Sequence, residues 1–330
     1  MTRFRPMTLN RRALLASGVG LAASTVLPRA AGASAAPLSL QASWSNDAEF
    51  AGYYVAMDKG WYKEAGLELA YLPGGPDVVP EGALAAGKCD VALTSPDTTV
   101  QAIVDQGAKF KIIGSQYQKN PLGVVSLAAK PIRTPKDLEG KTLAVPPVNG
   151  TSVDAMLALN GVDKAKVKIV PYEYDPTPLI KGEIDASIDF VTNVPYTIKS
   201  QSGRDAVSFL LYDFGFTITN DTVVVTEDTL KSKRKELVAF LKASRRGWAE
   251  NLRDPAAYPP KFADSYFKGT GRSIDNEVFY NGAQKPLIEA AGGIFAMSGD
   301  SIARAIEALG RVGVKARTDM FDVSLLAEIG

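Results

Sequence analysis

The apolar positions of this chain follow two different spacings from residue 38 onward. Compact apolar runs, typical of buried strands, alternate with segments in which apolar residues recur every three or four positions, as on one face of a helix. Phe50, Tyr53, Tyr54, Met57 and Trp61 show the helical spacing most clearly. Strands that alternate with helices predict parallel sheets covered by helices on both faces. The predicted strands are residues 38–44, 67–72, 89–94, 110–114, 124–128, 141–145, 167–172, 186–191, 207–211 and 222–225.

Capping signals locate the ends of several helices. Asp47 can cap the first helix and Gly66 can end it. Ser95-Pro96-Asp97 starts another helix directly after a predicted strand. Two cycles of strands and helices, followed by a mostly helical region, predict a two-lobed α/β protein with a helical C-terminal tail. The other predicted helices are residues 79–86, 153–159, 175–181, 230–252 and most of 257–330.

The first 35 residues have the composition of an export signal. Four arginines precede an uncharged stretch at 13–28, which is too short to span a bilayer comfortably, and small residues follow at 31–35. The Arg11-Arg12 pair, with Ala13-Leu14-Leu15 after it, resembles a twin-arginine signal. An ordinary secretory signal is the alternative. We therefore expect a soluble protein exported to the periplasm, without a lipid anchor, since no cysteine lies near the cleavage site.

Composition narrows the possible chemistry. The 330 residues include no histidine and one cysteine, and 37 basic side chains nearly balance 36 acidic ones. A Ser-His-Asp triad, a His-ligated zinc site, a CxxC redox pair and an intramolecular disulfide are therefore impossible. No overall basic field is available to attract nucleic acid. We expect no metal, no cofactor, no nucleic-acid partner and no transmembrane helix after the signal, and a buried, unreactive Cys89.

The carboxyl ends of the predicted strands hold the candidate binding residues, because ligands of open α/β sheets bind outside these ends. Trp44 ends the first strand, where it can stack on a flat ligand or pack in the core. Tyr53 can line the cleft or pack in the core. The polar groups of Ser95-Pro96-Asp97 and of residues 149–152 can contact a ligand or only cap helices. The candidate ligand-binding residues are Trp44, Asn46, Tyr53, Ser95, Asp97, Tyr117, Asn149, Thr151, Ser152, Asp189, Phe190, Asn193, Asp213 and Phe214.

These strand ends are rich in aromatic and acidic side chains and poor in basic ones, with Lys119 the nearest cation. A sulfonate or nitrate site needs cations or several converging N–H donors. The composition of the strand ends therefore predicts a small, planar, nitrogen-bearing ligand, neutral or cationic. Such a ligand would stack on aromatic rings and donate N–H groups to Asp or Asn side chains.

Five stretches of the chain are similar to a known family. They read FAGYYVAMDKGWYKEAGLEL, LPGGPDVVPEGALAAGKCDVALTSPD, TPKDLEGKTLAV, GEIDASIDFVTNVP and LLYDFGFTITNDTVVVTEDTL. The similarity covers most of residues 38–250 and, more loosely, the helical tail. The chain resembles periplasmic solute-binding proteins of ABC importers, in the group that binds sulfonates, nitrate, taurine and thiamine pyrimidine precursors.

The resemblance implies the type II periplasmic-binding-protein fold, in which two lobes of mostly parallel sheet close on a small molecule. It implies lobe I at residues 36–120 and 214–330, lobe II at 121–213, and crossovers near 117–123 and 211–216. It also implies a monomer whose partners are a small-molecule ligand and the permease and ATPase of one ABC importer. A periplasmic sensor with the same fold is an alternative.

The words FAGYYVA and LPGG are most similar to the branch that binds pyrimidine precursors of thiamine. Many members of that branch read Thr-Asn-Glu-Pro where this chain has Thr192-Asn193-Val194-Pro195, and Val194 cannot supply the carboxylate. A sulfonate, nitrate or another small organic solute is the alternative ligand. Enzymes of this fold, a pyrimidine synthase and a desulfinase, depend on histidine, so the resemblance implies a binding protein and not an enzyme.

Overall fold

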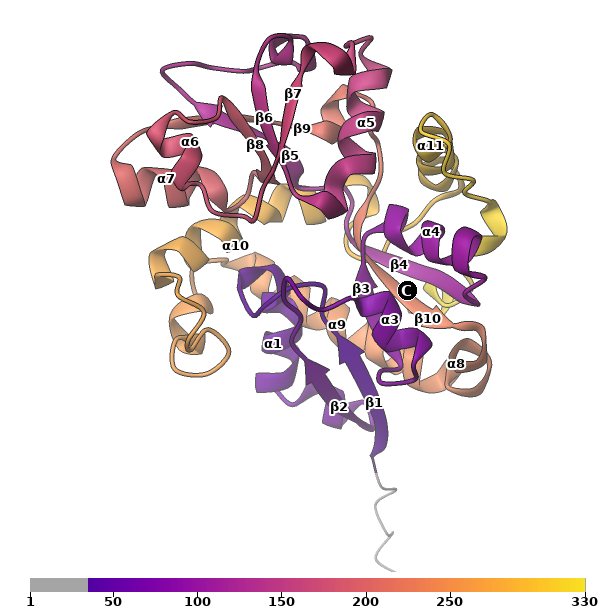
Figure 1. Ribbon diagram of the computed structural model, residues 1–330. Coiled ribbons are helices and arrows are strands. Elements are labelled where there is room, and N and C mark those ends of the chain that lie inside the picture. The colour runs from indigo at the N-terminus through magenta and orange to yellow at the C-terminus, as the bar shows by residue number, and fades with distance from the viewer. Residues whose placement is uncertain (1–34, 330) are drawn as a thin grey trace, which may run out of the picture. The chain divides into compact units, whose positions relative to one another are not determined.

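The computed structural model describes residues 35–329, in which the strands form two sheets of five strands each (Figure 1). Sheet A has the strand order β2-β1-β3-β10-β4, and sheet B has the order β7-β6-β8-β5-β9. The chain therefore completes four strands of sheet A, builds sheet B, and returns to sheet A with β10. The strands are β1 (Ala36–Gln41), β2 (Leu67–Leu72), β3 (Val91–Thr94), β4 (Phe110–Tyr117), β5 (Leu122–Leu127), β6 (Thr142–Val145), β7 (Lys168–Pro171), β8 (Ala186–Phe190), β9 (Ala206–Leu210) and β10 (Asn220–Thr226).

Helices occupy most of the intervals between the strands, as the alternating pattern predicted. The structure confirms the helical C-terminal tail, which follows β10. The α-helices are α1 (Ala51–Asp58), α2 (Trp61–Glu64), α3 (Pro80–Ala85), α4 (Pro96–Gln106), α5 (Gly150–Leu159), α6 (Thr177–Lys181), α7 (Val194–Ser202), α8 (Glu227–Ser232), α9 (Arg234–Arg253), α10 (Ile274–Ile288), α11 (Gly299–Gly310) and α12 (Leu326–Ile329).

One strand of each sheet runs against its two neighbours. β10 is antiparallel to β3 and β4, and β5 is antiparallel to β8 and β9. The first residues of β10 and β5 therefore lie at the edge where the other strands end. Asn220 pairs with Tyr117, the last residue of β4, and Leu122 pairs with Phe190, the last residue of β8. Each polar edge thus combines the ends of several strands with the start of one.

The first predicted helix is divided in the structure. Asp47 caps a 3-10 turn, η1 (Ala48–Phe50), by accepting a hydrogen bond from the Glu49 amide at 2.9 Å. Gly60, with φ of +71°, separates α1 from α2. The sequence pattern also failed to predict α7. Only Val194 and Ile198 of that helix are buried, so its helical spacing is too sparse to see in the sequence.

Helices α1 and α9 pack in direct backbone contact. A side chain at Gly247 would overlap the carbonyl oxygen of Gly52, and a side chain at Gly52 would overlap the indole ring of Trp248. Tyr53 stacks on Phe240 with 6.2 Å between ring centroids and meets Trp248 edge-on at 6.0 Å. This packing fixes α1 and the η1 turn that precedes it.

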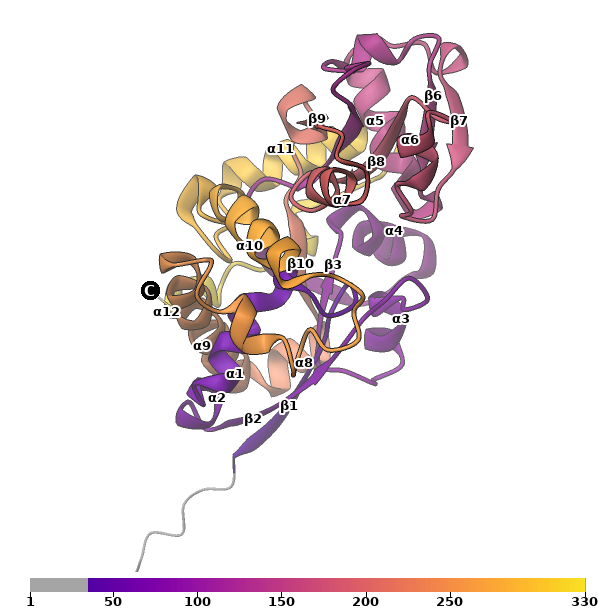
Figure 2. The ribbon, with the colours of Figure 1, turned by 90° about the vertical axis from the view of Figure 1, so that its left-hand side faces the viewer.

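The C-terminal tail contacts both sheets. Helix α10 lies between the part of the molecule built on sheet A and the part built on sheet B in both views (Figure 1, Figure 2). It reaches α7 through Asn276, whose amide donates to Thr197 Oγ1 at 3.3 Å. Helix α11 places Ala305 and Leu309 in the apolar cluster of sheet B. The tail is therefore part of both cores.

Within residues 35–329, no helix is both long enough and apolar enough to cross a membrane. The predicted export signal lies outside the described residues, apart from its last position. The chain passes between the sheets twice, from β4 to β5 and from β9 to β10. The lobe boundaries and crossover residues stay a prediction.

Candidate functional site

Aromatic side chains of the two sheets meet where the strands end. Trp44, which follows β1 of sheet A, contacts Tyr174, which follows β7 of sheet B, with 4.9 Å between ring centroids. Tyr117 at the end of β4 meets Phe190 at the end of β8 at 6.4 Å. Each sheet has one edge at which most of its strands end. These two aromatic pairs bring that edge of sheet A into contact with that edge of sheet B.

The Trp44–Tyr174 pair is accessible from solvent. The Gly74 amide donates to the Trp44 carbonyl oxygen at 2.8 Å, which holds the Trp44 segment beside the end of β2. Tyr174 has a φ of +61°, a conformation that is unfavourable for an aromatic residue, and its hydroxyl lies 3.5 Å from Asn149 Oδ1. Trp44 is half-buried and Tyr174 is 37% exposed. A flat molecule can therefore reach both rings.

Sheet B presents one buried carboxyl at this edge. Asp189 of β8 is 2% exposed and accepts a hydrogen bond from the Ser187 hydroxyl at 2.5 Å. The buried Tyr172 hydroxyl approaches the same carboxyl but completes no hydrogen bond. Burial raises the pKa of Asp189 to about 7, against the opposing effect of the two hydroxyls. Asp189 therefore gains and loses its proton near neutral pH.

Sheet A presents a pair of buried carboxyls. Glu49 of η1 and Asp221 of β10 lie close enough for each carboxyl to shift the pKa of the other. The Ser43 hydroxyl lies 2.8 Å from Asp221 Oδ1 and 3.3 Å from Glu49 Oε1. Gln116 Nε2 donates to Asp221 Oδ2 at 3.1 Å, whereas the buried Gln116 Oε1 has no partner. Because Ser43 directly precedes Trp44, this pair adjoins the segment that holds the exposed ring.

The pKa values of both carboxyls of this pair are raised by burial. Burial raises the pKa of Glu49 well above its ordinary value, and the Asp221 and Asp47 carboxylates raise it further. Burial also raises the pKa of Asp221, but the neighbouring Glu49 and Ser43 side chains oppose that shift. Both carboxyls therefore keep their protons to a higher pH than exposed carboxyls do.

Helix α10 and the residues before it hold η1 in place. Arg272 forms an ion pair with the buried Asp47. Glu277 accepts a hydrogen bond from the Ala48 amide at 2.7 Å, and Gln284 donates to the Ala48 carbonyl oxygen at 2.6 Å. These contacts join residues more than two hundred positions apart. They fix the turn that contains Glu49.

Two buried tyrosines extend this network. Tyr280 of α10 donates to Glu49 Oε2 at 2.8 Å. Tyr117 of β4 donates to Gln284 Oε1 at 2.6 Å. Burial raises the pKa of both hydroxyls, and the nearby Glu49 carboxyl adds to the shift. Both tyrosines therefore remain protonated donors at neutral pH.

A polar contact joins α4 of the sheet A half to α5 of the sheet B half. The Ser152 hydroxyl donates to Asp97 Oδ2 at 3.0 Å, and Gln101 Nε2 donates to Thr151 Oγ1 at 3.3 Å. Burial raises the pKa of Asp97, and the Ser152 hydrogen bond opposes the shift. Asp97 and Ser152 thus contact each other directly.

Many of the predicted binding residues have contacts along these edges. Ser95 donates to Asn220 Oδ1 at 2.9 Å and makes no capping bond to α4. Asn46 accepts a hydrogen bond from the Tyr54 hydroxyl at 3.2 Å. The predicted residues that the structure places at the joined edges or at the α4–α5 contact are Trp44, Asn46, Ser95, Asp97, Tyr117, Asn149, Thr151, Ser152, Asp189 and Phe190.

The other predicted residues have their contacts elsewhere. Tyr53 is fully buried in the α1–α9 core, and its hydroxyl has no hydrogen-bond partner. Asp213 is exposed and forms an ion pair with Lys119 at 3.4 Å. Phe214 packs edge-on against Phe209 with 4.8 Å between centroids. Asn193 contacts only the Thr197 hydroxyl of its own helix, at 3.5 Å.

Sequence reasoning missed several residues of these edges. Tyr172 ends the predicted strand 167–172 and Tyr174 follows it, so the end of this strand is the signal that could have identified both residues. Asp221 is the second residue of β10, so it lies at this edge only because β10 is antiparallel. Glu49 falls between helical apolar positions and resembles an exposed residue in the sequence. Arg272 has no local signal, because its partner Asp47 is 225 positions away.

Val194 lies in an apolar cluster. It is 8% exposed and belongs to a group that includes Val125, Leu127, Leu179 and Ile198. A carboxylate at this position would enter the core between sheet B and α7. Valine at position 194, in place of the glutamate of the Thr-Asn-Glu-Pro motif, is therefore compatible with the packing of this chain.

Cys89 is buried, as predicted from its apolar neighbours. Burial raises the pKa of its thiol to about 11, and Asp90 adds to the shift. The thiol is therefore protonated and unreactive at neutral pH. In the described part of the chain, no group of three or more acidic or cysteine side chains is arranged to hold a metal ion.

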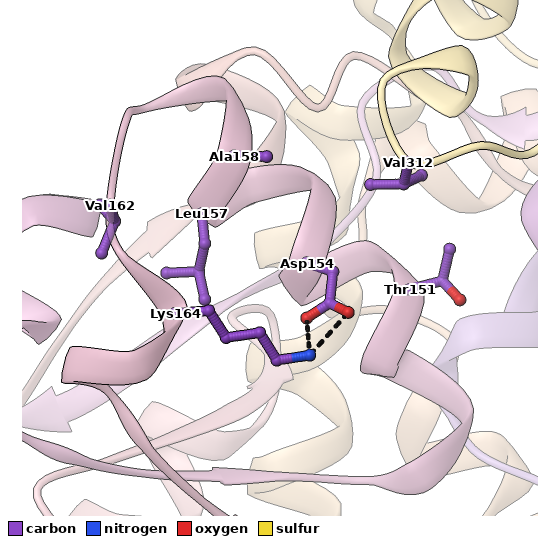
Figure 3. A pocket seen from close by; sticks show the side chains of 7 residues that line it. All are labelled: Thr151, Asp154, Leu157, Ala158, Val162, Lys164 and Val312. Carbon is purple, nitrogen blue, oxygen red and sulfur yellow. Dashed lines mark hydrogen bonds and ion pairs between the residues drawn. The ribbon is translucent and has the colours of Figure 1, made fainter.

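A separate hollow of about 330 Å³ adjoins α5 (Figure 3). Lys164 and Asp154 line it and form an ion pair at 2.7 Å. Thr151 is the member of the predicted binding set among its lining residues, and the aromatic pairs are not part of it. Its lining residues are Thr151, Asp154, Leu157, Ala158, Val162, Lys164 and Val312.

Comparison with known sequences identifies relatives of this chain. Residues 47–258 match the family described as NMT1/THI5 like. The chain is 26% identical to the riboflavin-binding protein RibY of Chloroflexus aurantiacus over 223 residues, which cover 66% of this chain and 63% of that protein. It is 24% identical to a formylaminopyrimidine-binding protein of Halalkalibacterium halodurans over 219 residues, which cover 64% of this chain and 65% of that protein. The match spans slightly less than two thirds of each relative.

Comparison with solved structures shows the fold. The periplasmic aliphatic sulphonate binding protein SsuA of Escherichia coli superposes with a TM-score of 0.66 at 13% identity, covering 83% of this chain and 91% of SsuA. This likeness and the two mixed sheets confirm the predicted two-lobed periplasmic-binding-protein fold. Because the family match covers well over half of the chain, the protein belongs to the NMT1/THI5-like family.

Proposed function

We propose that this protein is the substrate-binding component of an ABC-type importer. It would act in the periplasm, capture a small ligand between the edges of sheets A and B, and deliver it to a permease and its ATPase. The proposed binding residues are Trp44, Tyr174, Tyr117, Phe190 and Asp189. Lobe I would comprise residues 36–120 and 214–330, and lobe II residues 121–213.

The observation that supports this proposal most directly is the Trp44–Tyr174 pair. Its two rings come from different sheets, remain accessible from solvent, and have buried carboxyls beside them on both sheets. Aromatic rings favour stacking on a planar molecule, with a contribution of about 0.5–1.5 kcal/mol beyond area burial. Carboxylates accept hydrogen bonds from N–H groups. A planar nitrogen heterocycle meets both requirements.

The best candidate ligand is a pyrimidine precursor of thiamine. Two relatives are named for the binding of planar nitrogen heterocycles, riboflavin and formylaminopyrimidine. A sulfonate or nitrate fits less well, because anions require free cations or converging N–H donors. Arg272, the basic side chain in this network, is already paired with Asp47.

A binding role is also favoured over an enzymatic one. The chain has no histidine for acid–base or nucleophilic chemistry, and its one cysteine is buried, with the pKa of its thiol raised. The buried carboxyls at the edges are suited to accepting hydrogen bonds. We therefore propose no catalysed reaction.

A thermal-shift screen tests this function. The panel holds hydroxymethyl- and aminomethyl-pyrimidines, thiamine, riboflavin, taurine, alkanesulfonates and nitrate. A ligand at a hundred times its dissociation constant adds about 2.7 kcal/mol of stability, which raises the melting temperature by several degrees. We expect this shift with pyrimidines or riboflavin. A shift only with sulfonates or nitrate would contradict the proposed ligand class, and no shift with any compound would contradict the assignment to planar heterocycles.

A further inference from the structure

We infer that this site selects a planar heterocycle with a protonated amine on a side arm, and that Asp189 receives the amine. The inference rests on the proposed function, because it names the ligand class of the same site. It concerns the charge of the ligand, which neither the family membership nor the aromatic pair determines.

The charges along the two edges support a cationic ligand. Asp189 lies on the sheet B side, and the Glu49–Asp221 pair lies on the sheet A side. Within residues 35–329, no lysine or arginine forms an ion pair with any of these three carboxyls. Arg272 is held by Asp47, and Lys119 by Asp213. A buried negative charge without a cation is costly, so a ligand with a positive charge would be stabilised here.

Unmet hydrogen bonds point to the same ligand. The Tyr172 hydroxyl is buried beside Asp189 without a partner, and Tyr172 is only 5% exposed. The fully buried Gln116 Oε1, next to Asp221, also lacks a partner. An ammonium group has three N–H donors and no acceptor. The Asp189 carboxylate and the Tyr172 oxygen can accept from such a group, whereas a neutral hydroxyl brings one donor.

The aromatic pair places the two acidic sides within reach of one small molecule. The pKa of Tyr174 is raised to about 12 by burial first, then by the charges of Asp189 and Glu49. The Tyr174 ring therefore lies in the field of both edges. Because Trp44 contacts that ring, a heterocycle stacked on the pair would extend its side arm toward Asp189. A cation near these rings gains further attraction from their faces.

The surroundings of Asp189 determine how its charge depends on pH. Tyr172 from β7 faces it, Ser187 lies beside it on β8, and Gly123 of β5 pairs opposite it in the ladder. Tyr174 is the other titratable neighbour, and Asp175 acts on Tyr172 from farther away. None of these groups is a cation. Asp189 therefore becomes negative as the pH rises through about 7.

Calorimetric titration of the protein with two probes tests the inference. The probes are the aminomethyl and hydroxymethyl forms of the same aminopyrimidine, which differ in side-arm charge and little in shape. At pH 8 we expect the aminomethyl form to bind at least tenfold more tightly. Asp189→Asn keeps the shape and removes the charge, so it should abolish the preference. Asp205→Asn, an exposed acid of the same half that pairs with Lys199, serves as the matched control.

A second readout needs no variant. Lowering the pH from 8 to 5.5 should weaken the aminomethyl probe at least fivefold as Asp189 takes up a proton, and should leave the hydroxymethyl probe unchanged. Equal or tighter binding of the hydroxymethyl probe, or no binding of the aminomethyl probe, would overturn the inference. If riboflavin or the hydroxymethyl probe still binds in that case, the proposed function stands without it.

Discussion

The polar edges of the two sheets are built in opposite ways. On sheet A, Ser43, Gln116 and Tyr280 form hydrogen bonds with the Glu49 and Asp221 carboxyls, and α10 holds the turn that contains Glu49. On sheet B, the Asp189 carboxyl has one short hydrogen bond, and the buried Tyr172 and Thr192 hydroxyls have no partner. The comparison indicates that sheet A is largely preorganised, with Gln116 Oε1 as an unpartnered group at this edge, and that sheet B has bonding capacity for a ligand.

The largest expected change in stability tests whether the region around α10 preorganises the edge of sheet A. Arg272→Gln removes the partner of the buried Asp47 and leaves that carboxyl without a compensating charge. We expect a loss of about 3 kcal/mol in the free energy of unfolding, measured by chemical denaturation at pH 7. Adding Asp47→Asn should restore much of the loss. A loss below about 1 kcal/mol would show that α10 does not hold this edge.

The next effect tests the pH response of sheet B. The pKa of Asp189 is raised to about 7 in the folded protein, so between its ordinary value of 3.8 and 7 the folded state holds a proton that the unfolded state has lost. Its stability contribution is complete below pH 4 and disappears as the pH rises to 7. Asp189→Asn should therefore be more stable than the wild type at pH 8, by on the order of 2 kcal/mol.

The same comparison at pH 4 supplies the control for this prediction. There, the wild-type carboxyl is protonated in the folded state and about half protonated in the unfolded state, so the advantage of Asp189→Asn should vanish. Melting temperatures of both proteins from pH 4 to 8 give the result. Parallel curves across this range would contradict the burial-driven shift.

The smallest effect comes from one substitution made in each half. Thr192→Val removes a buried hydroxyl that has no partner, so we expect a gain of up to about 1 kcal/mol. Thr99→Val removes a buried hydroxyl that bonds to Thr94 at 2.6 Å and to Glu81, so we expect a loss of about 1 kcal/mol. Denaturation midpoints measure both changes. A loss in both variants would contradict the contrast between the two edges.

The sequence predicted the fold better than it predicted the site. Strands such as β3 and β6 are short, mainly apolar runs that end at turn residues, so their ends and the side chains after them were visible in the pattern. Trp44 and Ser95 were proposed as binding residues in this way. The direction of β10 was not visible, because a strand's apolar pattern is the same in either orientation, and Asp221 was missed for that reason.

Long-range polar contacts account for other residues near the site that the sequence pattern did not reveal. Arg272 and Gln284 belong to a helix whose local pattern says nothing of η1, yet they bond to Asp47 and Ala48. Tyr53 lies on the apolar face of the first predicted helix, which left cleft lining and core packing both open, and the α1–α9 contact buries it. Packing partners far along the chain decide such cases.

The most direct test of the central claim, that a ligand binds between the two sheet edges, is a double-mutant cycle on affinity. Trp44→Leu, Tyr174→Leu and the double variant are titrated with the panel compound that gives the largest thermal shift. Trp61→Leu, whose ring lies under Arg246 away from the edges, is the control. We predict that each single variant weakens binding at least tenfold, that the double variant is less than additive, and that the control binds normally. Unchanged affinity in either single variant would contradict the account.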